Sequence, residues 1–97
     1  MLSIVIPAFN EEKYLTRLLD SIKKQTYKNY EIIIADADSK DNTRKMAKKY
    51  GCKVIKGGIP AVGRNNGAKV AKGDILLFMD ADAIIGEKFL ENGLNEM

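Results

Sequence analysis

Two carboxylates separated by one residue, Asp80 and Asp82, follow the most apolar run of the chain, residues 75–79. In an extended segment, residues two apart point to the same side, about 6.5–7 Å apart along the chain. Such a pair can hold a hard divalent cation such as Mg²⁺ or Mn²⁺, which can stabilise a diphosphate as a leaving group. The alternative is that both aspartates only end a strand and begin a helix, but their position after the apolar run favours a metal site.

A third acid, Asp36, follows a second apolar run at residues 31–35. In nucleotide-binding α/β sheets, an acid at a strand end is placed to accept hydrogen bonds from a ribose or a base. The same residue could instead form a turn, because Asp38, Ser39 and Asp41 follow it and favour turns and caps. The residues alone favour neither interpretation over the other, and the two are about equal.

A basic side chain, Arg64, lies between Gly63 and Gly67 at the expected start of a helix. Helix N-termini favour anions, and Arg64 could bind a phosphate or carboxylate with two N–H groups. The alternative is an ordinary helix start with a surface arginine. Two glycines there lower helix stability, which indicates close backbone packing or the approach of a ligand.

The elements that must position these residues follow from hydrophobic periodicity. Apolar runs alternate four times with amphipathic helical segments, which predicts an α/β fold: a Rossmann-like three-layer α/β/α arrangement with a mainly parallel four-strand sheet. Ligands bind such sheets beyond the carboxyl ends of the strands, where all the polar segments above fall. We expect strands at residues 3–7, 31–35, 53–55 and 75–79, and helices at about 11–24 (capped by Asn10), 43–50 (ended by Gly51), 62–72 (ended by Gly73) and 89–97, the last burying Phe89, Leu90, Leu94 and Met97.

Composition excludes several classes of protein. The 97 residues are 45% hydrophobic and 30% charged, which predicts one globular domain. The absence of histidine excludes a Ser-His-Asp triad, a Cys-His pair and a histidine zinc site. Cys52 is expected in the core rather than as a nucleophile. No stretch approaches the ~20 apolar residues of a membrane span, so a cytoplasmic location is the default expectation, with membrane association left to a partner or a missing region.

The turn after the first strand, residues 7–12, contains no glycine and two glutamates, which excludes a dinucleotide-binding Rossmann loop. The net charge is +3. The densest basic cluster is interpreted as a solvated face, the alternative being a surface that attracts phosphates, nucleic acid or an anionic membrane. The lack of interleaved aromatic residues argues against nucleic acid as a partner. The cluster consists of Arg44, Lys45, Lys48, Lys49, Lys53 and Lys56.

Together these segments resemble glycosyltransferase family 2, the inverting family with the A-type glycosyltransferase fold. Residues 3–12 (SIVIPAFNEE) resemble its opening strand and turn, and residues 35–43 (ADADSKDNT) its second motif, usually Val-Asp-Asp-Gly-Ser-x-Asp-x-Thr. The segments GRNNG (63–67), AKGD (71–74) and FMDAD (78–82) resemble the remaining donor-site motifs in order. The resemblance covers nearly the whole chain.

The resemblance implies a nucleoside diphosphate sugar as donor, with a uridine or guanosine base. Asp82 would be the main metal ligand, and Asp80 would touch the ribose or the metal. Asp36 would hold the base, and Arg64 would lie near the base or the phosphates. The other expected donor-binding residues are Pro7, Ala8, Glu11 and Ala81.

Two departures from the family pattern stand out. Ala37 and Asp38 replace its second aspartate and its glycine, which alters the turn and the expected base preference. Family members also continue well beyond the position of Met97, into an acceptor site and a catalytic base. We therefore expect residues 1–97 to be a single nucleotide-sugar-binding domain that stops before the acceptor-binding half and contains no catalytic base.

Two alternatives remain open. A non-catalytic assembly module is one, because half of a fold leaves an unpaired sheet edge that invites association; a homodimer or domain-swapped oligomer is then expected. A phosphatase of the haloacid dehalogenase type is the other, because there too an Asp-X-Asp follows an apolar strand and one aspartate is the nucleophile. That family places the motif on an early strand, which disfavours this second alternative.

Overall fold

The computed structural model describes residues 1–96 and contains four strands and four helices. In chain order they are β1 (Leu2–Ala8), α1 (Glu12–Lys23), β2 (Tyr30–Asp36), α2 (Thr43–Lys49), β3 (Lys53–Lys56), α3 (Pro60–Val70), β4 (Ile75–Phe78) and α4 (Phe89–Asn95).

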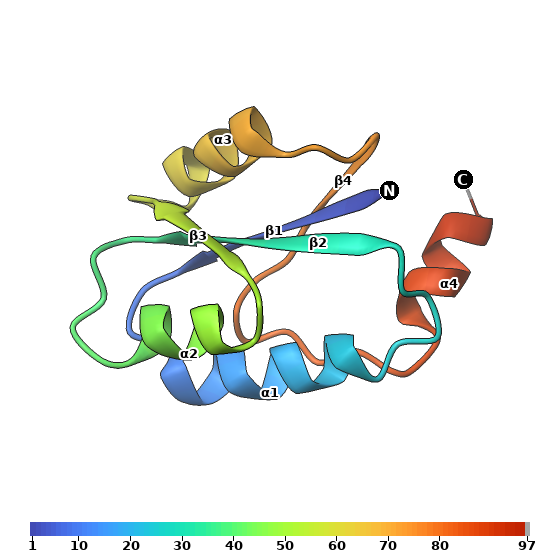
Figure 1. Cartoon of the computed structure of the whole chain (residues 1–97), viewed down its shortest axis with the longest axis horizontal. Helices are drawn as coiled ribbons and strands as arrows, with labels where there is room; N and C mark the ends of the chain where they lie inside the picture. The colour runs from blue at the N-terminus through green and yellow to red at the C-terminus, as the bar shows by residue number, and fades with distance from the viewer. Residues whose placement is uncertain (97) are drawn as a thin grey trace.

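The strands form one parallel sheet in the order β3-β2-β1-β4. Figure 1 shows α3 on one face of this sheet, α1 and α2 on the other, and α4 beyond one end. The predicted three-layer α/β/α architecture is therefore confirmed. Because all four strands run in the same direction, their carboxyl ends meet at one edge of the sheet.

The core lies mainly between the sheet and α1. Alternate residues of β1, such as Ile4 and Ile6, are fully buried on this side, while Val5 is buried toward α3. This accounts for the continuous apolar run of β1, which is covered on both faces. Cys52 is buried at the start of β3, as predicted, and burial raises the pKa of its thiol to about 11. The buried positions of α1 follow a one-face helical pattern: Leu15, Leu18, Leu19 and Ile22.

The first helix begins differently from the prediction. Asn10 does not cap it: this residue has a left-handed backbone (φ +50°), and its side-chain oxygen accepts the N–H of Lys40 at 2.7 Å. Glu11 occupies the N-cap position without a side-chain capping bond. Tyr14, in the first turn of α1, is exposed, and the guanidinium of Arg17 lies over its ring. By contrast, Gly51 ends α2 with φ +83°, as predicted.

Helix α3 starts two residues earlier than predicted, because Pro60 fits the first helical position. It also ends at Val70 rather than near Gly73. The N–H of Gly73 donates instead to the hydroxyl of Ser3 at 2.8 Å, which ties the α3–β4 connection to β1. Gly63 and Gly67 therefore lie inside the helix rather than at its anion-binding start.

Strand β4 is less buried than its apolar sequence predicted. Ile75 and Leu77 pack against the core, but Leu76 and Phe78 are 42% and 45% exposed. The physical reason is topological: β4 is an edge strand, and α3 packs over β1, β2 and β3 instead.

In α4, Leu90 is buried as expected, Phe89 is exposed, and Met97 lies outside the described residues. Within residues 1–96, no helix combines the length and the hydropathy that crossing a membrane requires.

Candidate functional site

The predicted site residues meet at the carboxyl edge of the sheet. Ala8 and Asp36 are paired at the ends of β1 and β2. The N–H of Met79 donates to the carbonyl of Val5 at 3.0 Å, which places the following residue, Asp80, beside the end of β1. The tertiary structure thus brings three separate sequence motifs to one edge.

The Asp80–Asp82 pair lies in a turn and not in the extended segment that we assumed. The N–H of Ala83 donates to the carbonyl of Asp80 at 3.0 Å, and both aspartate side chains are exposed. Ala81, between them, is buried in the core cluster. A contact between Ala81 and a ligand would therefore have to involve its backbone.

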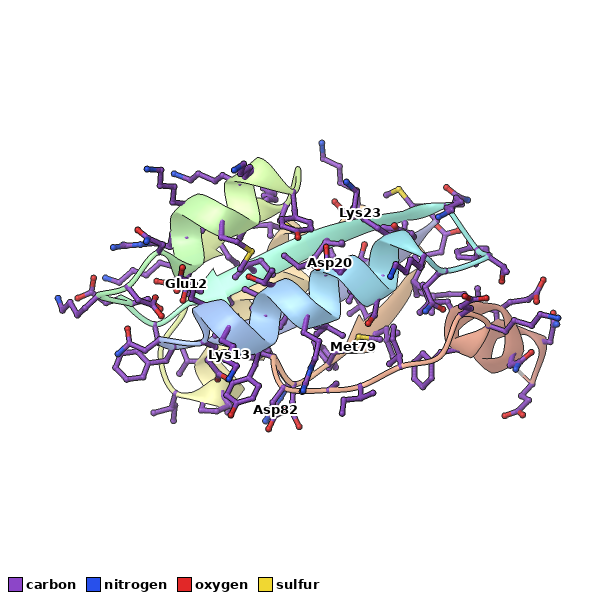
Figure 2. The ribbon with its side chains drawn as sticks, turned by 90° about the horizontal axis from the view of Figure 1, so that it is seen from below. Glu12, Lys13, Asp20, Lys23, Met79 and Asp82 are labelled. Carbon is purple, nitrogen blue, oxygen red and sulfur yellow. The ribbon has the colours of Figure 1, made fainter. Side chains whose placement is uncertain are left out.

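Arg17 of α1 holds this turn from the side. Its Nη2 atom donates to the carbonyl of Asp82 at 3.1 Å, and its guanidinium lies 5.4 Å from the ring centre of Tyr14. Figure 2 shows Asp82 on the loop that runs beside α1. Sequence reasoning missed Arg17, because nothing in the α1 sequence indicates which residue of its polar face meets a loop 65 positions away.

Glu11 shares the same negative environment. Burial raises the pKa of its carboxyl above the usual 4.5, and the charges of Asp82, Asp80 and Asp41 raise the pKa further. Each of these carboxylates disfavours the ionised form of Glu11 because like charges repel. A bound cation would relieve this repulsion.

The carboxylates suit a hard divalent cation. Residues 1–96 contain no group of three side chains placed to bind a metal together. The turn at Asp80–Asp82 supplies two exposed carboxylates. Magnesium is commonly held in this way, by one or two carboxylates with substrate phosphates and water completing its shell. The donor set therefore fits Mg²⁺ or Mn²⁺ together with a diphosphate.

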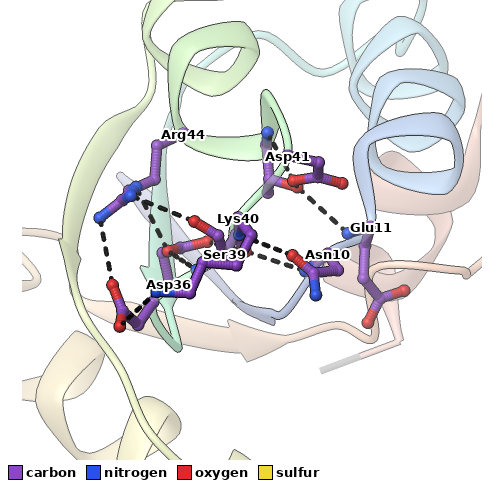
Figure 3. A network of polar contacts seen from close by, with 9 residues as sticks. Asn10, Glu11, Asp36, Ser39, Lys40, Asp41 and Arg44 are labelled. Atoms are coloured by element: carbon purple, nitrogen blue, oxygen red, sulfur yellow. Dashed lines mark hydrogen bonds and ion pairs between the residues drawn. The ribbon is translucent and has the colours of Figure 1, made fainter.

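Asp36 forms the turn that was one of its two possible roles. Its two carboxylate oxygens accept the N–H and the hydroxyl of Ser39 at 2.9 and 2.6 Å, and Arg44 Nε lies 3.6 Å from Oδ2. The side chain is buried. Figure 3 shows these contacts, together with the bond from the N–H of Asn10 to the Ser39 hydroxyl. The Asp36 carboxylate therefore joins the loops that follow β1 and β2, and its contact with a base stays a prediction.

The departure at Asp38 has a backbone consequence. This residue adopts a left-handed conformation, with φ +62°. Glycine adopts that conformation freely, which explains its place in the usual family motif, and aspartate tolerates it better than most residues. The turn is thus kept although the glycine is absent.

Arg64 lies in the second turn of α3. Gly63 faces Pro7 and Ala35, and the side chain of Asn66 donates to the carbonyl of Lys56 on β3. Successive residues of an α-helix are rotated by about 100°, so Arg64, two residues before Asn66, points away from the side of α3 that contacts β3. Arg64 therefore lies on the side of α3 toward β4. None of the ion pairs within residues 1–96 includes Arg64. Its contact with a phosphate stays a prediction.

Comparisons with known proteins agree with this arrangement. The family model described as glycosyl transferase family 2 matches residues 3–97. Glycosyltransferase GlyG of Streptococcus pneumoniae serotype 4 is 36% identical over 100 residues, covering 94% of this chain and 33% of that protein.

Two solved structures are similar. Staphylococcus aureus TarS 1-349 in complex with UDP-GlcNAc superposes with a TM-score of 0.88 at 33% identity, over 97% of this chain and 30% of that one. Glucosyl-3-phosphoglycerate synthase from Mycobacterium tuberculosis, in complex with Mn²⁺, UDP and glucosyl-3-phosphoglycerate, gives 0.69 at 29% identity, over 87% and 34%.

This chain spans about one third of the length of these relatives. Within that third, the four-strand parallel sheet, the order of the motifs and the family model all agree. The chain therefore belongs to glycosyltransferase family 2 and has the A-type fold of that family.

Proposed function

We propose that this chain is the donor-binding part of a glycosyltransferase that uses a uridine diphosphate sugar and a divalent metal ion. One observation carries the proposal: the acids at the ends of β1, β2 and β4 meet at one edge of a sheet that superposes on TarS, whose structure contains UDP-GlcNAc. Uridine is preferred over guanosine because the synthase structure also contains UDP.

The roles of the residues follow from their positions. Pro7 and Glu11 flank the carboxyl end of β1 and would line the nucleoside pocket, while the buried Ala8 would shape it through its backbone. Asp36 would accept a hydrogen bond from the base with a lone pair that its turn leaves free. Arg64 would approach the phosphates from α3 as a cation with several N–H donors.

Asp80 and Asp82 would hold Mg²⁺ or Mn²⁺. When bound, the ion would neutralise the diphosphate and stabilise it as a leaving group. Mn²⁺ in the synthase complex supports this assignment. The turn at Asp80 and the Arg17 bond to the Asp82 carbonyl would keep both carboxylates at the edge of the site.

An inverting transfer also needs a base beside the acceptor hydroxyl. We assign none to residues 1–96 and expect the base and the acceptor site in the part of the relatives that has no counterpart here. Residues 1–97 would then form a single donor-binding domain. The family match gives no support to the haloacid dehalogenase-type alternative.

Titration calorimetry with Mn²⁺ and UDP-GlcNAc tests the proposal. We expect the chain to bind UDP-GlcNAc in the presence of Mn²⁺, and Asp82→Asn to weaken this binding at least ~tenfold, because loss of a metal-site group typically costs that much. Asp74→Asn is the matched control: it removes the same charge from an exposed position at the other end of β4. No binding by the unaltered chain, or an equal loss in both variants, would overturn the proposal.

A further inference from the structure

The charges of this chain are strongly segregated along its sequence. Residues 42–73 contain nine lysines and arginines and no acidic residue, whereas the rest of the chain contains all thirteen acids and seven basic residues. This segment comprises α2, β3 and α3. A charge asymmetry of this size indicates an anionic partner.

The fold gathers the segment on one side of the molecule. β3 is an edge strand, and α2 and α3 pack against it from the two faces of the sheet (Figure 1). We call α2, β3, the loop between β3 and α3, and the side of α3 that faces β3 the basic flank, which excludes Arg64 on the other side of α3. The opposite side, residues 74–96, contains six acids and one lysine. The charge difference therefore runs across the sheet, from the β3 edge to the β4 edge.

Few of the cations on the basic flank have an acidic partner. Arg44 pairs with Asp36 and Asp38, and none of the other ion pairs within residues 1–96 involves the basic flank. The spacing adds repulsion, since like charges four residues apart on a helix destabilise it, and both Arg44–Lys48 and Lys45–Lys49 have that spacing. The lysines of the basic flank are all exposed: Lys45, Lys48, Lys49, Lys53, Lys56 and Lys69.

Exposed apolar side chains lie among these cations. In the loop between β3 and α3, Ile59 is 70% exposed, and Val62 in the first turn of α3 is 43% exposed. Gly58, in the same loop, lies close to Val62: a Cβ on Gly58 would lie 3.2 Å from Val62 Cγ1. Gly58 also lines a pocket of about 660 Å³ together with Lys48, Lys56 and Arg44, and the two aspartates in its lining, Asp36 and Asp38, both pair with Arg44. The exposed Ile59 therefore follows directly after a residue of a pocket that basic side chains line.

We propose that the basic flank binds the surface of an anionic lipid bilayer, with Ile59 inserted among the headgroups. Exposed lysines on the same side of the molecule as an exposed apolar residue match such a surface, because the ammonium groups attract anionic headgroups while the apolar side chain enters the headgroup–acyl boundary. Contact through the β3 edge leaves the carboxylates that follow β4 accessible. Because the two surfaces are separate, the bilayer proposal does not depend on which donor binds beside β4.

A nucleic acid fits this surface less well. Single-stranded nucleic acid binding commonly uses aromatic side chains on which bases stack. Tyr50 is the one aromatic residue in 42–73. Its ring lies 5.5 Å from the ammonium of Lys23, and its hydroxyl donates to Asp20 at 2.5 Å. It is therefore already engaged within the chain.

Vesicle sedimentation with the full chain tests the proposal. We expect binding to phosphatidylglycerol–phosphatidylcholine vesicles but not to pure phosphatidylcholine, and release by high salt. Lys48→Glu with Lys56→Glu should weaken binding at least ~25-fold, or about fivefold for each lysine lost. Lys13→Glu with Lys88→Glu is the matched control, because it changes the net charge equally at exposed positions outside the basic flank. Circular dichroism confirms that all variants fold.

Ile59→Ser distinguishes a bilayer from other polyanions. It should weaken vesicle binding while leaving retention on a heparin column unchanged, because heparin offers anionic groups without an apolar layer. The proposal is overturned if the chain binds both types of vesicle equally, or if the two double lysine variants lose vesicle binding equally. It is also overturned if Ile59→Ser leaves vesicle binding unchanged. Binding to a single-stranded RNA oligonucleotide at a salt concentration that releases the vesicles would also overturn it.

Discussion

At the scale of single residues, Glu11, Asp80 and Asp82 concentrate negative charge at the carboxyl edge of the sheet, and none of the ion pairs within residues 1–96 includes them. Glu11 lies within the field of Asp82, Asp80 and Asp41, and its pKa is raised first by burial and then by these charges. Arg17 is close, but its guanidinium donates a hydrogen bond to the backbone carbonyl of Asp82. The ionised form of Glu11 is therefore less stable in the folded chain than in the unfolded one.

We expect Glu11→Gln to raise the melting temperature at pH 7.5 and to raise it less at pH 4. When the pKa of a carboxyl group is higher in the folded chain than in the unfolded chain, the protonated group stabilises the fold at a pH below both pKa values. This stabilisation is lost as the pH rises through the pKa of the folded chain. At neutral pH, where Glu11 is ionised, its carboxylate is partly buried and repelled by the neighbouring carboxylates. Glutamine carries no charge and removes this destabilisation. The helix dipole favours a carboxylate at this N-cap, but the net pKa shift is upward, so repulsion and burial prevail.

Thermal unfolding followed by circular dichroism at both pH values measures this effect. Glu87→Gln, at an exposed position outside the cluster, is the control and should change the melting temperature little at either pH. If Glu11→Gln raised the melting temperature equally at pH 4 and pH 7.5, ionisation of Glu11 would not be the cause of the increase.

At the scale of elements, α3 approaches the sheet through its glycines. A Cβ on Gly67 would lie 2.2 Å from Val5 Cγ1, which is shorter than any real contact, and one on Gly63 would lie 3.3 Å from both Pro7 and Ala35. The glycines therefore let the helix backbone lie directly on β1 and β2. This close approach also fixes where Arg64 stands relative to the carboxyl edge.

We expect Gly67→Ala to destabilise the fold by ~1–3 kcal/mol, because a methyl group inserted at this contact forces α3 away from β1. Gly93→Ala is the matched control in α4: a Cβ there meets nothing within 4 Å. It should be neutral or stabilising by up to ~1 kcal/mol, since alanine favours a helix over glycine. Urea unfolding measures both changes, and similar values for the two variants would contradict the packing described for α3.

At the scale of the whole molecule, the two sheet edges differ in character. The β3 edge is basic, whereas the β4 edge exposes Leu76 and Phe78. Next to them, a groove of about 210 Å³ between β4 and α4 is lined by apolar residues that include Phe89 and Leu94. An unpaired edge strand with exposed apolar side chains favours pairing with another chain.

We therefore expect concentration-dependent self-association in sedimentation velocity. Leu76→Lys with Phe78→Lys should reduce it, because charge on an edge strand opposes pairing with a second copy. Ile59→Lys is the control: it removes a more exposed apolar residue from the other side of the sheet and should leave association unchanged. A chain that stays monomeric over the whole concentration range would contradict the expected homodimer.

Much of the fold is already determined by local sequence. The apolar periodicity predicted every strand and helix type, because the pattern of an element reflects which of its faces are covered. Gly51 marked the end of α2, since glycine adopts the left-handed backbone that this helix end requires. The order of the motifs was enough to indicate the family, because several short motifs rarely occur in one sequence in the same order by chance.

Only the tertiary structure decided the features that depend on distant neighbours. The apolar run of β4 does not reveal that this strand lies at the edge, because strand order is set by contacts between separate elements. The Arg17 bond to Asp82 and the contact between Gly67 and Val5 likewise join positions far apart in the chain. The acid-free segment 42–73 is visible in the sequence, but it becomes one surface because α2 and α3 both pack against β3. Sequence determines local conformation through nearby residues, whereas exposure and charge fields depend on long-range packing.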